Sequence, residues 1–332
     1  MRREALPRVL LGALISVVFL ALVISRVDLP AVGAALGHAN PALMAAALGV
    51  LVVDLLLRAF RWRVLLAALV PAPPSLRGAA AYLTIGFMAN AVLPARLGDV
   101  ARAYLAGAAF GTARLATLGT VLIERVSDGL MMVLLAALSS VLVVSGIAAE
   151  LRDLQVAAIL LVIAGFVGLG VLLVALRRGP LARTRPGTLA AALVGRLGTG
   201  AAALRTPRGA ATVVGATVAA ALSATVIWAL VLAAVGLTLS PQQVLLVCSG
   251  TALSLAIPAA PSSLGTFEYV GVLILTSFGA TAEVALAAIV LFRLSTTIPM
   301  ALVGLAVMWA THLRPGALVE AAEHEAAGPG RA

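Results

Sequence analysis

The chain has 332 residues, of which 62% are hydrophobic and only 11% are charged, and its mean hydropathy is +1.14. This composition excludes a soluble globular fold and indicates a membrane protein. The formal net charge is +10, and every basic residue is arginine, because the sequence contains no lysine. That absence excludes enzymes that depend on a phosphate-loop lysine, a pyridoxal Schiff base or an S-x-x-K acyl site. Since the arginines lie between apolar segments, we expect them to meet lipid phosphates and no nucleic acid.

Six apolar segments are long enough to cross a bilayer, whose core of about 30 Å requires about 20 helical residues. They cover residues 9–25, 41–57, 115–144, 154–176, 209–237 and 283–313. We therefore predict an all-α polytopic membrane protein of about six transmembrane helices, in a single domain over residues 1–314. The first segment lacks a small-residue cleavage site, so we expect it to be an uncleaved anchor.

The arginines are distributed unevenly over the loops between these segments. If the N-terminus is cytoplasmic, almost all loop arginines fall on the cytoplasmic side, and Arg26 and Arg152 fall outside. Positively charged loops are retained in the cytoplasm. We therefore expect both termini to be cytoplasmic, with residues 315–332 as a short polar tail. The composition is typical of a GC-rich bacterial genome, so the expected location is a bacterial plasma membrane.

Two further apolar stretches, residues 78–94 and 244–261, do not fit this orientation as simple spans. Each ends in proline and glycine, and crossing the bilayer with either would place an arginine-rich loop on the wrong face. We predict that both are re-entrant helical segments. Broken backbone at membrane depth is tolerated where it is buried in protein or lines a polar cavity, so the two breaks predict a cavity.

The two breaks resemble each other, which indicates an internal repeat. Identical residues recur about 167 positions apart and include Pro94 with Pro261, Gly98 with Gly265, and Arg125 with Arg293. Each copy, residues 1–148 and 149–314, would hold three spans and one re-entrant segment. Because three is odd, the second copy is inverted. Inverted repeats with broken helices are typical of secondary transporters, whose substrate site lies where the halves meet.

The first break is rich in positive charge. Pro94 and Gly98 end and restart a helix, which leaves free amide groups that favour an anion. Arg96 and Arg102 would add the fixed charge that binds phosphate, and Asp99 would orient one of them. The alternative is that both arginines merely anchor the cytoplasmic face.

The second break lacks these arginines. Pro261 and Gly265 break the chain, and Glu268 follows as the first charge. A carboxylate next to a broken helix must be paired, protonated or solvated, because an isolated ion is costly in hydrocarbon. We expect its partner to be Arg293 or Arg125, in either a gating role or a structural ion pair.

Three charges, Glu124, Arg125 and Asp128, interrupt an otherwise apolar segment. Arg125 and Asp128 are three residues apart and share a helix face, so we predict that they pair locally while Glu124 points elsewhere. Three charges together indicate a packed polar interior. The alternative is a helix–helix ion pair without a transport role.

A second charged cluster closes the segment 41–57. Asp54 and Arg58 have the spacing of an ion pair within one helix. Trp62 and Arg63 are predicted to anchor the membrane interface, where tryptophan and arginine are enriched.

Neither a metal nor a cofactor is expected. The histidines, His38, His312 and His324, have no spacing to acidic residues or to cysteine that suggests converging ligands. Cys248, the single cysteine, lies in an apolar stretch and is predicted to be a core residue.

At these residues the chain resembles the flippase-like family, the integral-membrane part of lysylphosphatidylglycerol synthetases and their stand-alone relatives. The resemblance rests on Arg58-Ala59-Phe60-Arg61-Trp62, Asn90, Leu93-Pro94-Ala95-Arg96-Leu97-Gly98-Asp99, Arg102, Glu124-Arg125-Val126-Ser127-Asp128 and Pro261-Ser262-Ser263-Leu264-Gly265 with Glu268. It implies a polytopic protein that moves lipids between leaflets, without the soluble aminoacyl-transfer domain of the fused members. The family usually has Glu where this chain has Asp99, which shortens the reach of the carboxylate.

Together these observations predict a lipid flippase, not an enzyme, that moves an anionic or aminoacylated phospholipid or a lipid-linked phosphate through a polar cleft between inverted repeats. The expected substrate-binding residues are Asn90, Arg96, Asp99, Arg102, Glu124, Arg125, Asp128, Glu268 and Arg293. Glu268 and Asp128 would hold the arginines while the site is empty. The expected partners are membrane phospholipids and a separately encoded lipid-modifying synthase. The alternatives are a secondary carrier of a small organic anion, a membrane-embedded lipid-phosphate transferase, and a scaffold for such a synthase.

Overall fold

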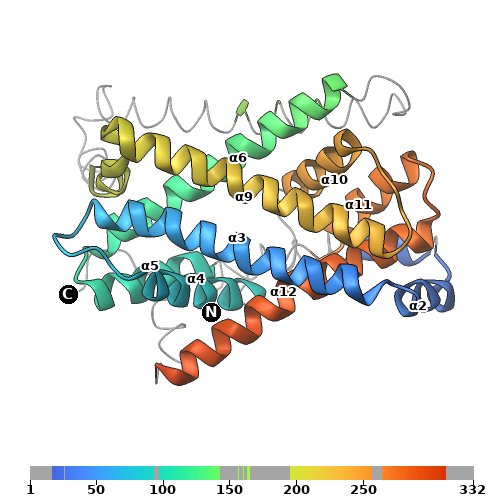
Figure 1. Ribbon diagram of the computed structural model, residues 1–332, viewed down its shortest axis with the longest axis horizontal. Helices are drawn as coiled ribbons and strands as arrows, with labels where there is room; N and C mark the ends of the chain where they lie inside the picture. Colours follow the sequence, from blue (N-terminus) through green and yellow to red (C-terminus); the bar gives the residue numbers. More distant parts are fainter. Residues whose placement is uncertain are drawn as a thin grey trace.

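The computed structural model describes residues 17–25, 27–92, 97–142, 195–255 and 264–311, together with the isolated positions 156, 160, 163 and 164. Within these residues the chain is helical and no strand occurs, so the predicted all-α class is confirmed (Figure 1). The elements are α2 (Leu29–Gly37), α3 (Pro41–Ala67), α4 (Leu76–Val92), α5 (Leu97–Phe110), α6 (Arg114–Leu142), the 3-10 helix η3 (Thr199–Arg205), α9 (Pro207–Ala234), α10 (Pro241–Ser254), α11 (Thr266–Ser277) and α12 (Ala282–Ala310).

Three helices, α3, α9 and α12, are long and apolar enough to cross a membrane. A fourth span exists if residues 17–24 and α2, which meet at 82°, are counted together. These helices correspond to the predicted spans at 41–57, 209–237 and 283–313. The predicted span at 115–144 forms α6, which is 29 residues long but carries charges in its first half. The predicted span at 154–176 and the tail at 315–332 lie outside the described residues, apart from the four isolated positions.

The long helices begin where the sequence provides caps. The side chain of Asn40 accepts hydrogen bonds from the backbone N–H groups of the first turn of α3, and Pro41 occupies the first helical position. Thr206 with Pro207 begins α9 in the same way, and Ser240 begins α10 with a capping box. Proline fits at the first position because its missing N–H would have no partner in the helix.

Large apolar side chains on the outer faces of α3, α9 and α12 are exposed. They include Val52 and Leu56 of α3, Val214 of α9, and Leu302 and Leu305 of α12. Soluble proteins rarely leave such contiguous apolar surface in water. A membrane provides the apolar surroundings that these faces require.

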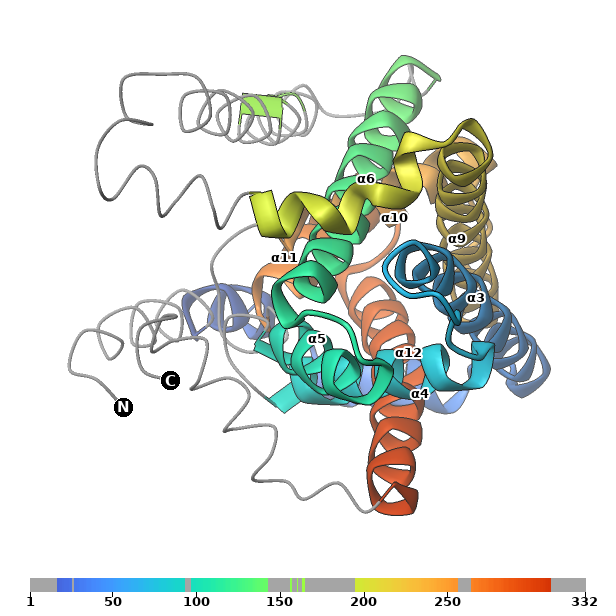
Figure 2. The same ribbon diagram turned by 90° about the vertical axis from the view of Figure 1, so that its left-hand side faces the viewer.

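Each predicted break falls between two helices that pack against each other. Helix α4 ends at Val92 and α5 begins at Leu97, and the two lie side by side (Figure 2). A Cβ atom at Gly98 would lie 2.4 Å from the backbone nitrogen of Asn90, so only glycine permits this close approach. In the same way, α10 ends at Ser254 and packs against α11, which follows the second break.

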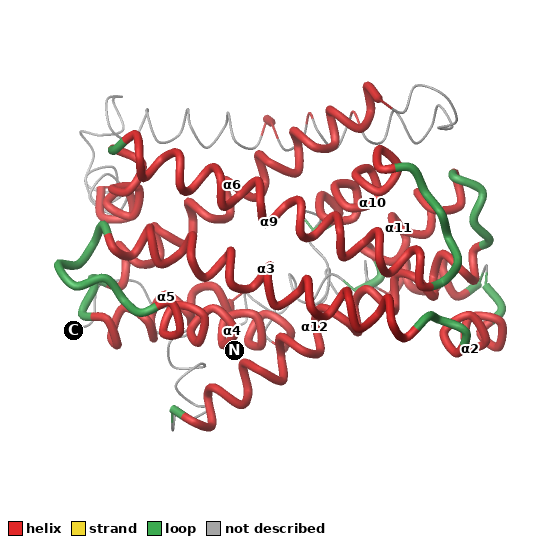
Figure 3. Tube along the Cα trace, in the orientation of Figure 1, coloured by secondary structure: helices red, strands yellow, loops and turns green. Residues whose placement is uncertain are grey.

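The two halves of the chain pack on each other in a reciprocal pattern. Helix α3 lies along α9, α12 lies along α4, and α6 lies along α10 (Figures 1 and 3). The contact of α12 with α4 is close, because a Cβ atom at Gly304 would lie 2.3 Å from the carbonyl oxygen of Thr84. Helices from one half of the sequence therefore complete the packing of the other half.

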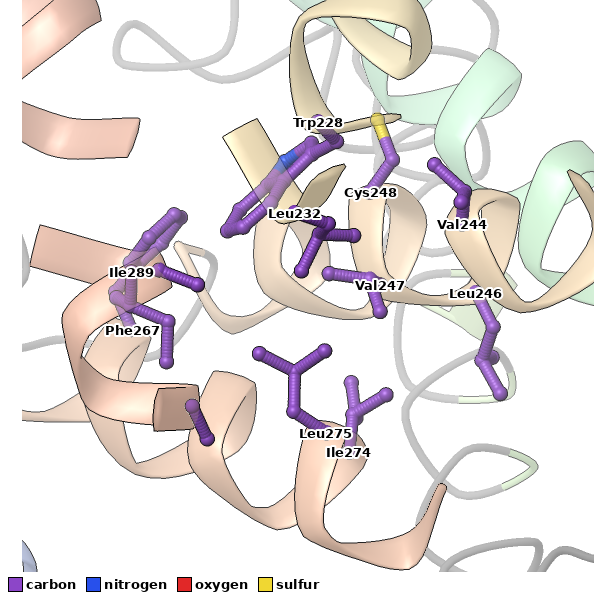
Figure 4. Packing of buried hydrophobic residues seen from close by; sticks show 12 residues of the cluster. Trp228, Leu232, Val244, Leu246, Val247, Cys248, Phe267, Ile274, Leu275 and Ile289 are labelled. Atoms are coloured by element: carbon purple, nitrogen blue, oxygen red, sulfur yellow. The ribbon is translucent and has the colours of Figure 1, made fainter. Parts of the chain in front are cut away.

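The largest apolar cluster belongs to the second half of the chain. It joins α9, α10, α11 and α12 around Trp228, Leu232, Val247 and Ile289 (Figure 4). Cys248 is buried in this cluster, so its predicted place in the core is confirmed. Apolar packing of this kind fixes the positions of α11 and α12, which carry the charged residues of the second half.

Candidate functional site

Side chains of α3 and α5 meet those of α6 in a continuous set of ion pairs. The set contains four arginines and four carboxylates, so its formal charge is balanced. We call it the polar network; its members are Asp54, Arg58 and Arg61 of α3, Asp99 and Arg102 of α5, and Glu124, Arg125 and Asp128 of α6. Charges inside an apolar bundle are tolerated when they are paired and hydrogen-bonded, and the balance satisfies that condition.

Arg61 lies at the centre of the polar network, and its side chain is 2% exposed. Its Nη1 donates to Asp128 Oδ1 at 2.5 Å and to Thr217 Oγ1 at 3.0 Å. Its Nη2 donates to Glu124 Oε1 at 3.3 Å. Since Thr217 belongs to α9, this one guanidinium group connects α3 with both α6 and α9.

Glu124 joins Arg61 to Arg102, whose side chain is fully buried. The Nη2 atom of Arg102 donates to Glu124 Oε2 at 2.9 Å, and its guanidinium carbon lies 4.5 Å from the centre of the Trp62 ring. Trp62 in turn donates from Nε1 to Thr120 Oγ1 at 3.0 Å. The prediction that Trp62 anchors the interface is therefore wrong: the ring is buried because Arg102 stacks on it and Thr120 satisfies its N–H group.

Asp99, in the first turn of α5, is the carboxylate that holds Arg125. The Nε atom of Arg125 lies 3.0 Å from Asp99 Oδ2. The side chain of Asn90 donates to Asp99 Oδ1 at 3.2 Å, and Arg102 lies 3.9 Å from the same oxygen. Asp99 therefore has two cations and one amide as neighbours. Its predicted contact with Arg102 is present, and Arg125, which was not predicted, is the nearer cation.

The predicted local pair of Arg125 with Asp128 on α6 is wrong. Asp128 contacts Arg61, and it lies 3.6 Å from Arg58. Arg125 contacts Asp99 instead. The helical spacing fixes only that the two side chains share a face; carboxylates and arginines arriving from α3 and α5 decide which pairs form.

The predicted pair of Asp54 and Arg58 is confirmed, with Arg58 Nε 2.7 Å from Asp54 Oδ2. Ser223 of α9 donates to the other carboxylate oxygen, Oδ1, at 2.7 Å. Arg63 lies outside the polar network and donates to the carbonyl oxygen of Pro74 at 2.8 Å.

A second, separate pair lies in the other half of the chain. The Nε atom of Arg293 in α12 lies 2.6 Å from Glu268 Oε1, so of the two predicted partners, Arg293 and Arg125, it is Arg293 that forms the pair. The backbone N–H of Gly265 donates to Glu268 Oε2 at 2.6 Å, and Gly265 has a φ of +89° that favours glycine. The guanidinium carbon of Arg293 lies 4.6 Å from the ring centre of Phe267.

The arginines differ in how much of the side chain is exposed. Arg61 and Arg102 are 2% and 0% exposed, whereas Arg125 and Arg293 are 32% and 17% exposed. Arg58 is 20% exposed and pairs with Asp54 of its own helix. Arg125 and Arg293, which were predicted to correspond in the two halves of the sequence, each pair with a carboxylate of another helix.

Several predicted site features lie outside the described residues, namely Pro94, Arg96 and Pro261. Their neighbours Gly98 and Gly265 are described and begin α5 and α11. Asp128 was predicted to hold one of the arginines of the substrate site. Its partners among the described residues are Arg58 and Arg61, which do not belong to that set, so the prediction is wrong for the described arginines.

The structural importance of Arg61 was missed from the sequence. A signal was present, because Asp54, Arg58 and Arg61 are spaced four and three residues apart and form a polar stripe on an otherwise apolar helix. A polar stripe of this kind indicates a helix face turned toward a polar interior.

The family profile of the lysylphosphatidylglycerol synthase TM region matches residues 9–304, nearly the whole chain. The chain belongs to this family. The resemblance inferred from the charged and broken segments is thereby confirmed.

A curated relative is glycosyltransferase AglD of the archaeon Haloferax volcanii. The two are 37% identical over 142 residues, which is 42% of this chain and 21% of the relative. The chain thus matches about a fifth of that protein's length. This family membership, together with the apolar helices, identifies a multi-pass membrane protein related to lipid-modifying systems.

Proposed function

We propose that this family member is a lipid translocase that moves an anionic or aminoacylated phospholipid, or a lipid-linked phosphate, between leaflets. The observation that carries the proposal is the pair of accessible arginines, Arg125 and Arg293, each held by a carboxylate at the start of a broken helix. Arginine forms paired hydrogen bonds with phosphate as readily as with carboxylate. A headgroup phosphate can therefore replace Asp99 or Glu268 while the guanidinium keeps an anionic partner.

The proposed architecture is an inverted repeat with six spans and two re-entrant segments, with both termini in the cytoplasm of a bacterium. The reciprocal packing of α12 on α4 and of α6 on α10 supports it, as does the contact of α3 with α9. The two ion pairs occupy equivalent places, with the acid in the first turn after a break and the arginine in the next long helix. Transporters built this way bind substrate between the repeats and open to each side in turn.

The named relatives support a transport role for the shared membrane region. The family is named after a synthase of lysylphosphatidylglycerol, and the curated relative is named a glycosyltransferase. Two different chemistries on one membrane region favour a common task, moving the lipid, over either reaction. We therefore assign no catalytic role to this chain and propose that a separately encoded enzyme supplies the modified lipid.

The experiment is a leaflet-exchange assay with the whole protein in vesicles that contain a trace of fluorescent phosphatidylglycerol. A membrane-impermeant quencher removes the outer-leaflet signal, and further loss measures translocation. We expect the parent protein to expose the inner label. Arg125→Ala and Arg293→Ala each remove a charge-assisted contact worth about 1.5–3 kcal/mol, so translocation should slow roughly 10- to 100-fold.

Arg63→Ala is the matched control, because Arg63 contacts only the Pro74 carbonyl among the polar atoms of the described residues and should leave the rate unchanged. The proposal fails if folded parent protein exposes no more label than protein-free vesicles. The assignment of the two arginines fails if both alanine variants keep the parental rate.

A further inference from the structure

The two arginine–carboxylate pairs differ in what surrounds the carboxylate. Asp99 has Arg125 at 3.0 Å, Arg102 at 3.9 Å and the Asn90 amide at 3.2 Å. Within the part of the chain that the structure describes, Glu268 has one cation within 4 Å, which is Arg293. If a phosphate binds Arg125, Asp99 still has Arg102 as a neighbouring cation. If a phosphate binds Arg293, Glu268 has no other cation within 4 Å among the described residues.

The described surroundings of Glu268 supply no replacement cation. Its side chain is 6% exposed. Its partner Arg293 lies over the ring of Phe267, which stacks with Trp228 and Phe292. The groups that can carry charge on the described elements packed around it are Arg293 and Glu283 of α12, Cys248 of α10, Arg208 of α9 and Tyr269 of α11 itself, together with Asp28 and His38 at the two ends of α2.

None of these groups except Arg293 is a suitable counter-ion. Glu283 is an acid that lies ten residues from Arg293 along α12, which at 1.5 Å per residue is about 15 Å away. Arg208 lies in the first turn of α9, twenty residues before Trp228, and is about 30 Å from that ring along the helix. Asp28, Cys248 and Tyr269 carry no positive charge in any protonation state. The exposed ring of His38 is hydrogen-bonded to the carbonyl oxygen of Ala34 at the end of α2.

We propose that Glu268 is a proton-binding site, and that it takes up one proton when a lipid phosphate occupies Arg293. This inference rests on the proposed function. A buried carboxylate that has lost its only cation is strongly disfavoured, and such carboxyl groups bind a proton near neutral pH. The proton comes from the aqueous phase, and the carboxylate becomes a neutral carboxylic acid; no other bond is made or broken.

The geometry assigns the proton to one oxygen. Oε1 faces Arg293 at 2.6 Å and is the atom that becomes unpaired when phosphate arrives. Oε2 accepts the N–H of Gly265 at 2.6 Å, and a neutral carboxyl group can keep that bond through its carbonyl oxygen. The Gly265 amide therefore holds the side chain in place in both protonation states.

The consequence is proton-coupled movement of the lipid. A phosphatidylglycerol headgroup carries one negative charge, and one proton on Glu268 balances it. Because Asp99 keeps Arg102 as a neighbouring cation, no second proton is needed to balance its charge. Translocation is thus electroneutral and responds to a pH gradient rather than to the membrane potential.

The test is calorimetric titration of the whole, detergent-solubilised protein with dihexanoyl phosphatidylglycerol at pH 7. Repeating the titration in two buffers with different ionisation enthalpies gives the number of protons taken up per lipid. We expect about one for the parent and about zero for Glu268→Gln, whose amide oxygen can still accept the Gly265 N–H. Glu268→Asp keeps an ionisable group and should retain uptake, which distinguishes lost proton binding from misfolding.

Asp99→Asn is the matched control on the other pair. It removes the carboxylate that competes with phosphate for Arg125, so it should strengthen lipid binding yet leave about one proton taken up per lipid. Binding by the parent without proton uptake, or equal uptake by Glu268→Gln, overturns the inference and leaves the proposed function standing. A parent protein that binds no phosphatidylglycerol overturns the proposed function itself.

A second readout uses vesicles with a pH difference of one unit. Coupling to one proton drives the fluorescent lipid to about a tenfold difference between leaflets. Glu268→Gln should relax to equal leaflets, and protein-free vesicles report any spontaneous redistribution of the lipid. Equal leaflets with the parent protein would refute coupling.

Discussion

Replacement of Glu124 by glutamine is the sharpest test of the polar network. Glu124 lies between Arg102 at 2.9 Å and Arg61 at 3.3 Å, and all three side chains are buried. Arg61 would keep Asp128, but Arg102 would be left with Asp99 at 3.9 Å as its nearest carboxylate. Removing one partner of a buried ion pair costs about 3–5 kcal/mol, a large part of the 5–15 kcal/mol that stabilises a typical domain.

That loss corresponds to a decrease in Tm of about 10 °C for a protein of this size. Cys248 provides the assay, because it is the only cysteine and is buried, so a thiol-reactive dye reports unfolding in detergent. Adding Arg102→Met to Glu124→Gln restores the charge balance and should recover much of the loss, since neighbouring sites do not add independently. Glu283→Gln, outside the network, is the control. A Tm for Glu124→Gln within 2 °C of the parent would refute the role of the network in stability.

Two further substitutions test the close helix packing and the central arginine. Gly98→Ala would place a Cβ atom 2.4 Å from the Asn90 nitrogen and should lower Tm by several degrees. Gly33→Ala is the control, because no atom lies within 4 Å of the new Cβ, and its Tm should not change. Equal Tm values for the two variants would contradict the packing of α4 on α5. Arg61→Lys loses the forked guanidinium group that reaches two carboxylates and Thr217, and it should lower Tm by at least 5 °C, or about 2 kcal/mol. Arg63→Lys is the control and should change Tm little. Similar Tm values for the two variants would show that Arg61 is replaceable.

The helix breaks and the family were predictable because their signals are local. A proline and a glycine close together end a helix whatever surrounds it, and α5 and α11 begin where the sequence indicates. Glu268 was assigned two candidate partners, Arg293 and Arg125, and the pair with Arg293 is present. Helices α10, α11 and α12 carry only three charged residues, Glu268, Glu283 and Arg293, so the need to neutralise Glu268 left few choices.

The first half of the chain was harder because its charges are dense. Arg125 has Asp128 one turn away and Glu124 beside it, yet its partner is Asp99, which lies on another helix. Helical periodicity gives the face on which a side chain lies, but the identity of the helix opposite depends on tertiary packing. For the same reason Trp62 was assigned to the interface, although its ring lies under a buried arginine.

The two halves of the chain differ in how many helices their ion pairs connect. The polar network connects α3, α5 and α6, and through Thr217 and Ser223 it also reaches α9. Displacing any one of these helices would separate several buried ion pairs at once. The Glu268–Arg293 pair instead joins α11 to α12 through one ion pair. Under the proposed function, breaking that pair would leave the polar network intact, and the apolar cluster shared by α9, α10, α11 and α12 would still hold α11 against α12.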